Sequence, residues 1–272
     1  MPNKLIDSIG VGNGLDITMG RVPNHSVVNK FGINHAVRVV TTPEDIWEYG
    51  GLYIYDADGT APIVSLVSDD PVDIQTITIV GLDIFGNEVS QDITLTGTTR
   101  AALTTPLWRV YRMTNISSTG IAGMVYCYIG IGNVPDIDAI RAVIDNGHNQ
   151  TLMCLITIPK GKVGFLFQGE LGMQYNKGGV ATHEFAHCHY TSRRLGQVFT
   201  VKKSVTLLSN GNSIYQDKRS FPDVIPALTD LKISVIEVSD DMGMFGTLDI
   251  LLVDESQFSE SYLKSIGQPR EI

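Results

Sequence analysis

The stretch that decides the fold is Thr76-Ile77-Thr78-Ile79-Val80-Gly81-Leu82-Asp83, in which polar and apolar residues alternate. A period of two places the apolar side chains on one face of a β-strand. After the turn residues 84–88, the run from Val89 to Thr96 returns to strand composition, and Gly97-Thr98-Thr99 ends it. The two runs therefore predict a β-hairpin.

Further segments of strand length lie beyond this hairpin, separated by Gly, Pro, Asn and Asp. They span residues 108–113, 124–131, 151–158, 163–169, 182–191, 199–208, 231–238 and 246–253. Many short strands joined by turn signals are typical of β-sandwiches and jelly rolls. We therefore predict an all-β protein.

The spacing of the segments predicts two β-sandwich domains of jelly-roll type. Val134-Pro135-Asp136-Ile137-Asp138 is interpreted as the link between them, because Pro and Asp punctuate the chain before a new apolar block. The expected divisions are an extended N-terminal arm at 1–35, a first sandwich at 36–135, a second at 136–255 and a C-terminal tail at 256–272.

Two short helices are expected outside the strands. Thr42-Pro43-Glu44-Asp45 has a Thr N-cap, a Pro at the first helical position and acids in the first turn, and Gly50-Gly51 would end this helix. The segment Phe258–Ile266 has a weak helical period and predicts a short C-terminal helix or tail.

Charge and hydropathy argue against two classes of partner. The net charge of −9 and the pI near 5.1 disfavour nucleic acid, which needs a clustered basic surface. No apolar window approaches the roughly 18 residues needed to span a bilayer, and the first residues lack the apolar core of a secretory signal. Cys127, Cys154 and Cys188 are widely spaced, as expected of reduced, buried thiols.

One enzymatic motif is present. His183-Glu184-Phe185-Ala186-His187 satisfies the HExxH pattern. On a helix, the two His side chains share one face and bind zinc, and the Glu activates a bound water molecule. The motif thus raises the hypothesis of a zinc metalloprotease.

The same segment reads better as a strand. At a period of two, Ala186, Cys188 and Tyr190 share one face and the His residues share the other. On a strand, His183 and His187 stand roughly 13 Å apart, too far to bind one ion. The next Glu downstream is Glu237, so a nearby third ligand is missing as well. We expect no catalytic residue, metal or cofactor here, with a structural metal shared between subunits through His187 and His189 as the alternative left open.

Other candidate sites have simple interpretations. The acidic pairs Asp69-Asp70 and Asp240-Asp241 could hold calcium, but solvated turn residues are expected. Arg109 and Arg112, beside Trp108, are expected on an ordinary sandwich surface, with an interface as the alternative.

Three segments resemble virion structural proteins of tailed phages, especially phages of aquatic bacteria. They are Arg38–Trp47, the hairpin Gly81–Thr99, and Asn149–Met153 followed by Ile158–Lys162. A looser similarity extends to Leu251-Leu252-Val253-Asp254. These segments shape the fold and carry no active-site signature.

The resemblance implies a capsid decoration or cement protein. Such a protein is made in the cytoplasm of the host bacterium, trimerises, and sits on the outer capsid surface, where it bridges neighbouring major capsid subunits. The alternatives are a neck, tail or fibre-anchoring component, a carbohydrate-binding module, or the metalloprotease, which stoichiometric zinc would indicate. Decoration predicts many copies per virion, whereas a neck or tail position predicts few.

Overall fold

The described chain consists mostly of β-strands with a few short helical turns. A computed structural model describes residues 11–38, 42–175, 184–209 and 213–268. The strands are β1 (His25–Val37), β2 (Glu44–Asp45), β3 (Ile63–Ser68), β4 (Thr76–Leu82), β5 (Glu88–Thr94), β6 (Ala101–Leu107), β7 (Arg109–Asn115), β8 (Val125–Ile129), β9 (Ile140–Ile144), β10 (Leu155–Thr157), β11 (Lys162–Tyr175), β12 (Glu184–Arg194), β13 (Thr200–Ser209), β14 (Ser213–Ile225), β15 (Thr229–Val238) and β16 (Met242–Asp254). The helical elements are α1 (Val11–Thr18), η1 (Ile137–Ala139), η2 (Glu255–Gln257) and α2 (Glu260–Ser265).

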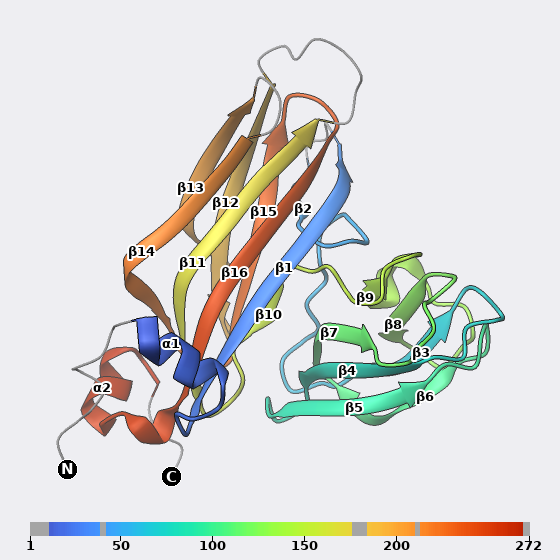
Figure 1. The fold of residues 1–272 in the computed structure, drawn as a ribbon, viewed down its shortest axis with the longest axis horizontal. Helices are drawn as coiled ribbons and strands as arrows, with labels where there is room; N and C mark the ends of the chain where they lie inside the picture. Colours follow the sequence, from blue (N-terminus) through green and yellow to red (C-terminus); the bar gives the residue numbers. More distant parts are fainter. Residues whose placement is uncertain (1–10, 39–41, 176–183, 210–212, 269–272) are drawn as a thin grey trace.

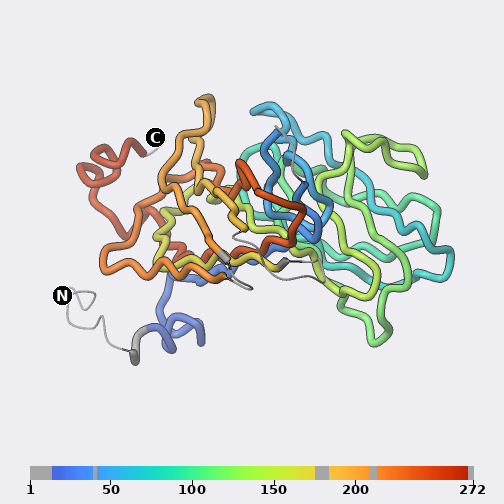
Figure 2. The backbone as a smooth tube through the Cα atoms, turned by 90° about the horizontal axis from the view of Figure 1, so that it is seen from above, coloured from blue at the N-terminus to red at the C-terminus, as the bar shows by residue number. Residues whose placement is uncertain are grey.

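These strands build two sandwiches that lie side by side (Figures 1 and 2). In the large sandwich, the sheet β1-β16-β11-β14 packs on the sheet β10-β15-β12-β13, to which β2 is added through β15. In the small sandwich, the sheets β6-β3-β8-β9 and β5-β4-β7 meet, with β5 beside β6 and β7 beside β9. The predicted all-β fold with two sandwiches is confirmed.

The predicted hairpin is β4–β5. Its strands pair antiparallel from Thr76 opposite Thr94 to Leu82 opposite Glu88. The turn between them is fixed by the Asp83 carboxylate, whose Oδ1 accepts hydrogen bonds from the backbone N–H groups of residues 85 and 87 at 2.8 and 2.9 Å. Gly86 has φ of +81°, a conformation that glycine adopts without a Cβ penalty.

The prediction of an extended N-terminal arm over residues 1–35 is wrong for the second part of that range. His25–Val37 forms β1, which pairs with β16 from His25 opposite Val253 onward, and α1 precedes it. The inward positions of β1 include Lys30, Gly32 and Asn34, all buried. Because these residues are not apolar, the hydrophobic alternation that reveals a strand is absent from the sequence.

Gly32 shows how closely β1 approaches the opposite sheet. A Cβ at this position would stand 2.3 Å from the backbone nitrogen of Cys154 and 2.7 Å from the carbonyl oxygen of Ile46. Glycine is required here because the neighbouring atoms belong to the backbone and have no rotamer through which to withdraw.

The helix predicted at residues 42–49 is also wrong. Glu44–Asp45 is the short strand β2, with Asp45 opposite Ser234 of β15. The buried Asp45 carboxylate accepts hydrogen bonds from Lys232 Nζ at 2.8 Å, Ser234 Oγ at 2.6 Å and the backbone N–H of Tyr53 at 2.8 Å. These tertiary contacts outweigh the local capping signals, which stabilise a helix by only about 1 kcal/mol.

The boundary between the two sandwiches also differs from the prediction. Residues 134–138 do not link them, because β9 follows and pairs with β8, with Val125 opposite Ile144. The chain instead enters the small sandwich after β2 and leaves it after β9, returning to the large sandwich at β10. The expected C-terminal helix is confirmed as α2, capped by Ser259, whose Oγ accepts from the Tyr262 backbone N–H at 3.2 Å.

A buried ionic network joins the sandwiches. Asp230 of β15 accepts Arg109 Nε of β7 at 3.3 Å and Arg193 Nε of β12 at 3.0 Å, and the Thr157 hydroxyl of β10 donates to the same carboxylate. The side chains of Arg109 and Asp230 are 3% and 4% exposed, so solvent screens this pair little. The Arg109 guanidinium also lies 4.0 Å from the ring centroid of Trp108.

Removing the shared carboxylate should therefore be costly. Asp230→Ala leaves two guanidinium groups without their acceptor, and we expect the free energy of unfolding to fall by about 3–5 kcal/mol. Urea denaturation measures this change. Asp16→Ala is the control, because its pair with Arg21 is exposed and such pairs contribute roughly 0–1 kcal/mol. Equal effects of the two variants would contradict a structural role for Asp230.

Candidate functional site

The HExxH segment lies on β12. The structure describes it from Glu184 onward, and His183 lies outside the described residues. Ala186, Cys188 and Tyr190 face the core, while His187 on the opposite face is half-buried. The predicted strand is thus confirmed from Glu184, and the described part of the motif does not form the helical turn in which HExxH binds zinc. That the protein has no catalytic activity stays a prediction.

His187 and His189 form a close pair on the outer face of β12. Their Nε2 atoms are 3.1 Å apart, and the rings meet edge to face at 4.9 Å between centroids. Burial and the neighbouring His187 lower the pKa of His189. Thr206 Oγ1 of β13 lies 2.9 Å from His187 Nδ1, and Ser204 Oγ lies 3.2 Å from its Nε2. Two imidazoles supply only half of a metal-ligand set, so the metal shared between subunits stays a prediction.

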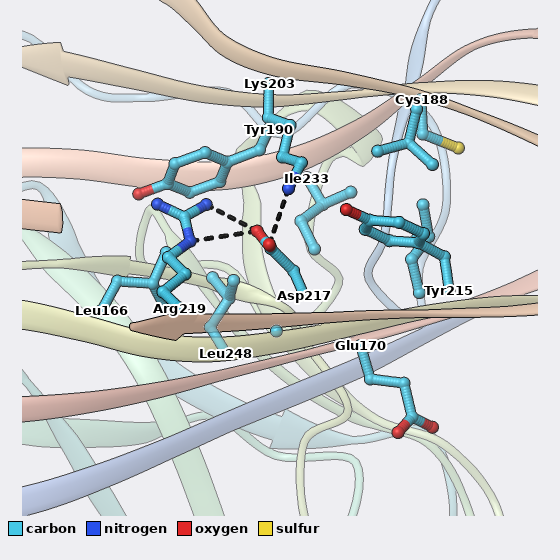
Figure 3. A pocket seen from close by; sticks show the side chains of 13 residues that line it. Leu166, Glu170, Cys188, Tyr190, Lys203, Tyr215, Asp217, Arg219, Ile233 and Leu248 are labelled. Atoms are coloured by element: carbon cyan, nitrogen blue, oxygen red, sulfur yellow. Dashed lines mark hydrogen bonds and ion pairs between the residues drawn. The ribbon is translucent and has the colours of Figure 1, made fainter. Parts of the chain in front are cut away.

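A small cavity lies between the two sheets of the large sandwich, where β13 and β14 face each other (Figure 3). Its lining is apolar apart from Glu170 and a charged group in which Lys203 Nζ contacts Asp217 at 2.6 Å and Arg219 Nη2 contacts Asp217 at 2.8 Å. Burial acts to raise the pKa of Asp217, but hydrogen bonds from Lys203 and Arg219 outweigh it and the pKa is lowered. Glu170 points away from the cavity (Figure 3).

This cavity is a packing feature. Its volume of about 40 Å³ is far below that of pockets for small molecules, about 300–1,000 Å³. The charged group of Lys203, Asp217 and Arg219 covers the apolar interior where the two sheets are not joined by backbone hydrogen bonds.

The cysteines fit their interpretation as buried thiols, whereas the absence of calcium at the acidic pairs stays a prediction. Cys127, Cys154 and Cys188 are free and buried, and burial raises the pKa of each thiol to about 12, which leaves them unreactive at neutral pH. Asp69 Oδ1 accepts a hydrogen bond from the Met124 backbone N–H at 2.7 Å.

Arg109 was expected on the surface of a sandwich but is instead buried at the junction of the two sandwiches.

Sequence reasoning missed an apolar hollow on the outer side of the small sandwich. The hollow has a volume of about 390 Å³ and is lined by Tyr49, Val67, Ser68, Asp69, Thr98, Tyr126, Asn133, Val134, Pro135, Ile137 and Ile140. Part of its wall is the loop between β8 and β9, in which Ile131, Val134 and Ile137 are 80%, 85% and 72% exposed. Exposed apolar residues concentrated around a hollow are typical of protein-binding surfaces. The available signal was the presence of Ile131, Val134 and Ile137 among turn residues, but 134–138 was interpreted as the link between the sandwiches.

Comparisons with known proteins leave the family open. No protein-family model and no curated protein matches the sequence. Among solved structures, the VP2 subviral particle of infectious bursal disease virus matches at 11% identity over 92% of this chain and 79% of that chain, with a TM-score of 0.21. The Gx strain of the same virus matches at 8% identity over 86% and 73% of the chains, with a TM-score of 0.25. Likenesses this weak carry no argument about fold or function.

In the described part of the chain, helices are too short for a membrane span.

The buried amine of Lys30 is a further group with unusual chemistry. Its Nζ donates to the carbonyl oxygen of Tyr111, which sits at the irregularity where β7 shifts register against β4. Burial, aided by the charge of Arg112, lowers the pKa of Lys30 from 10.5 to about 7. Its position inside β1 makes it a structural donor.

The Lys30 pKa predicts a pH-dependent stability. Between pH 7 and 10.5 the unfolded chain holds the Lys30 proton and the folded chain releases it, so raising the pH favours the folded state. Relative to Lys30→Met, the wild-type protein should gain about 1 kcal/mol in free energy of unfolding per pH unit from pH 7.5 to 9.5. Urea denaturation across this range is the measurement, with the exposed Lys202→Met as control. Parallel pH profiles for wild type and Lys30→Met would exclude the lowered pKa.

Proposed function

We propose that the protein is a virion structural component that decorates the capsid shell of a tailed phage, bridging neighbouring major capsid subunits. The resemblance of residues 38–47, 81–99, 149–153 and 158–162 to virion proteins supports this role. The all-β architecture suits it, because sandwiches present broad, rigid surfaces. A trimer on the outer capsid surface is part of the proposal, as are synthesis in the host cytoplasm and the absence of nucleic-acid and membrane partners.

The observation that carries the proposal is the apolar hollow beside the β8–β9 loop. An apolar side chain of a major capsid subunit would fill it, and Ile131, Val134 and Ile137 would pack around that side chain. Asp69 at the rim and the net charge of −9 favour a basic flank on the partner. Modest affinity suffices at each contact, because a multivalent subunit engages several sites on a symmetric lattice.

Substitution of the loop tests this contact. Val134→Asp and Ile137→Asp place a charge in the apolar surface, and we expect each to weaken binding to capsid shells lacking this protein by about tenfold or more, or about 1.4 kcal/mol. Co-sedimentation with purified shells measures binding.

The matched control is Phe221→Asp, which removes an 88% exposed apolar side chain from β14 of the large sandwich. Circular dichroism establishes that each variant is folded. Unchanged binding by both loop variants, or equal loss in the control, would place the contact elsewhere.

Copy number tests the position on the virion. Decoration of the shell predicts a copy number comparable with that of the major capsid protein, counted by gel densitometry of purified particles. A neck, tail or fibre-anchoring component follows the symmetry of the tail axis and would give about a dozen copies or fewer. The lower count would overturn the decoration role and favour the alternative.

A further inference from the structure

Three metal-ligating side chains converge near the junction of the sandwiches. They are His35 of β1, Glu48 in the turn after β2, and Asp145 directly after β9. One ligand atom from each lies within 4.8 Å of the others. His35 and Glu48 also line a solvent-open hollow of about 510 Å³, which gives an ion a path to the cluster.

A backbone hydrogen bond and the neighbouring His148 hold the cluster in place. The Glu48 side chain is 2% exposed, and its Oε2 accepts the Asp145 backbone N–H at 3.2 Å. His148 Nδ1 contacts Glu48 Oε1, and the His148 ring stacks on His35 at 6.2 Å between centroids. Each carboxylate oxygen has two lone-pair positions, so Glu48 can accept these contacts and still bind an ion.

We propose that His35, Glu48 and Asp145 bind one divalent transition-metal ion, with His148 orienting Glu48. An imidazole with carboxylates is a donor set that suits zinc and similar ions. Around a tetrahedral zinc, with bonds of about 2.0–2.2 Å, ligand atoms stand roughly 3.4 Å apart. The ligand atoms, within 4.8 Å of one another, therefore need to approach by at most about 1.4 Å to reach this separation. A histidine that donates to a ligating carboxylate is a common way of fixing its orientation.

The ion would link the two sandwiches. His35 belongs to β1 of the large sandwich, whereas Asp145 directly follows β9 of the small sandwich, and Glu48 lies on the segment that connects them. An ion bound only by the folded arrangement stabilises that arrangement. The bound ion would thus link the two sandwiches, as the Asp230 network does. The proposed ion site does not depend on the proposed contact with the capsid.

Zinc binding to the full chain tests the site. Protein stripped with EDTA and dialysed is titrated with ZnCl2 by calorimetry, and one ion per chain is expected from this cluster. Zinc at a hundredfold excess over Kd should raise the Tm by about 5–10 °C. Cobalt(II) in place of zinc should give a visible absorption band that reports a nitrogen and oxygen ligand field.

Variants separate this cluster from the other histidines. His35→Ala and Asp145→Asn should each weaken zinc binding at least about tenfold and abolish the Tm rise, since each removes a ligand. Glu48→Gln tests the buried ligand, and exposed His35 keeps the test valid if Glu48→Gln fails to fold. His187→Ala combined with His189→Ala is the control and should leave this binding unchanged. Zinc binding that survives in His35→Ala and Asp145→Asn, or that is lost only in the control, would overturn the proposal.

Discussion

The junction of the two sandwiches depends on the buried carboxylate of Asp230. Arg109 reaches it from the small sandwich and Arg193 from the large one, so a single acceptor relates strands far apart in the sequence. Charges this well buried attract each other strongly but are costly when unpaired, which favours the one arrangement that satisfies all of them. Arg141 of β9 adds a second link, binding Asp56 of the connecting segment at 2.7 Å.

Contacts across the junction of the sandwiches explain why β1 carries polar residues on its inner face. Lys30 supplies a hydrogen-bond donor to the Tyr111 carbonyl at an irregularity in the small sandwich, and Gly32 lets the Cys154 backbone approach. Asn34 Nδ2 donates to Glu44 Oε2 at 2.9 Å, near β2. Lys30 and Asn34 thus satisfy polar groups that an apolar side chain would leave unpaired. The strand therefore serves the junction as much as the core.

The candidate sites differ in how far the sequence could foretell them. Period-two alternation placed His187 and His189 on the outer face of a strand, and the structure agrees. The sequence offered only the apolar residues of the 131–137 segment as a signal for the hollow beside Val134, and none for the cluster at His35. Both are formed by segments separated by many residues, and nothing in a single sequence states that β1 and the end of β9 lie close together.

The fold class, the β4–β5 hairpin and the strand character of β12 could be predicted from local sequence patterns, because alternation and turn residues act over a few neighbouring positions. Only the tertiary structure decided the fate of residues 25–37 and 44–45 and the true division of the chain. At those places the deciding forces are hydrogen bonds and ion pairs between distant strands. The buried contacts of Asp45 with Lys232 and Ser234 outweigh a helix signal that only its nearest neighbours support.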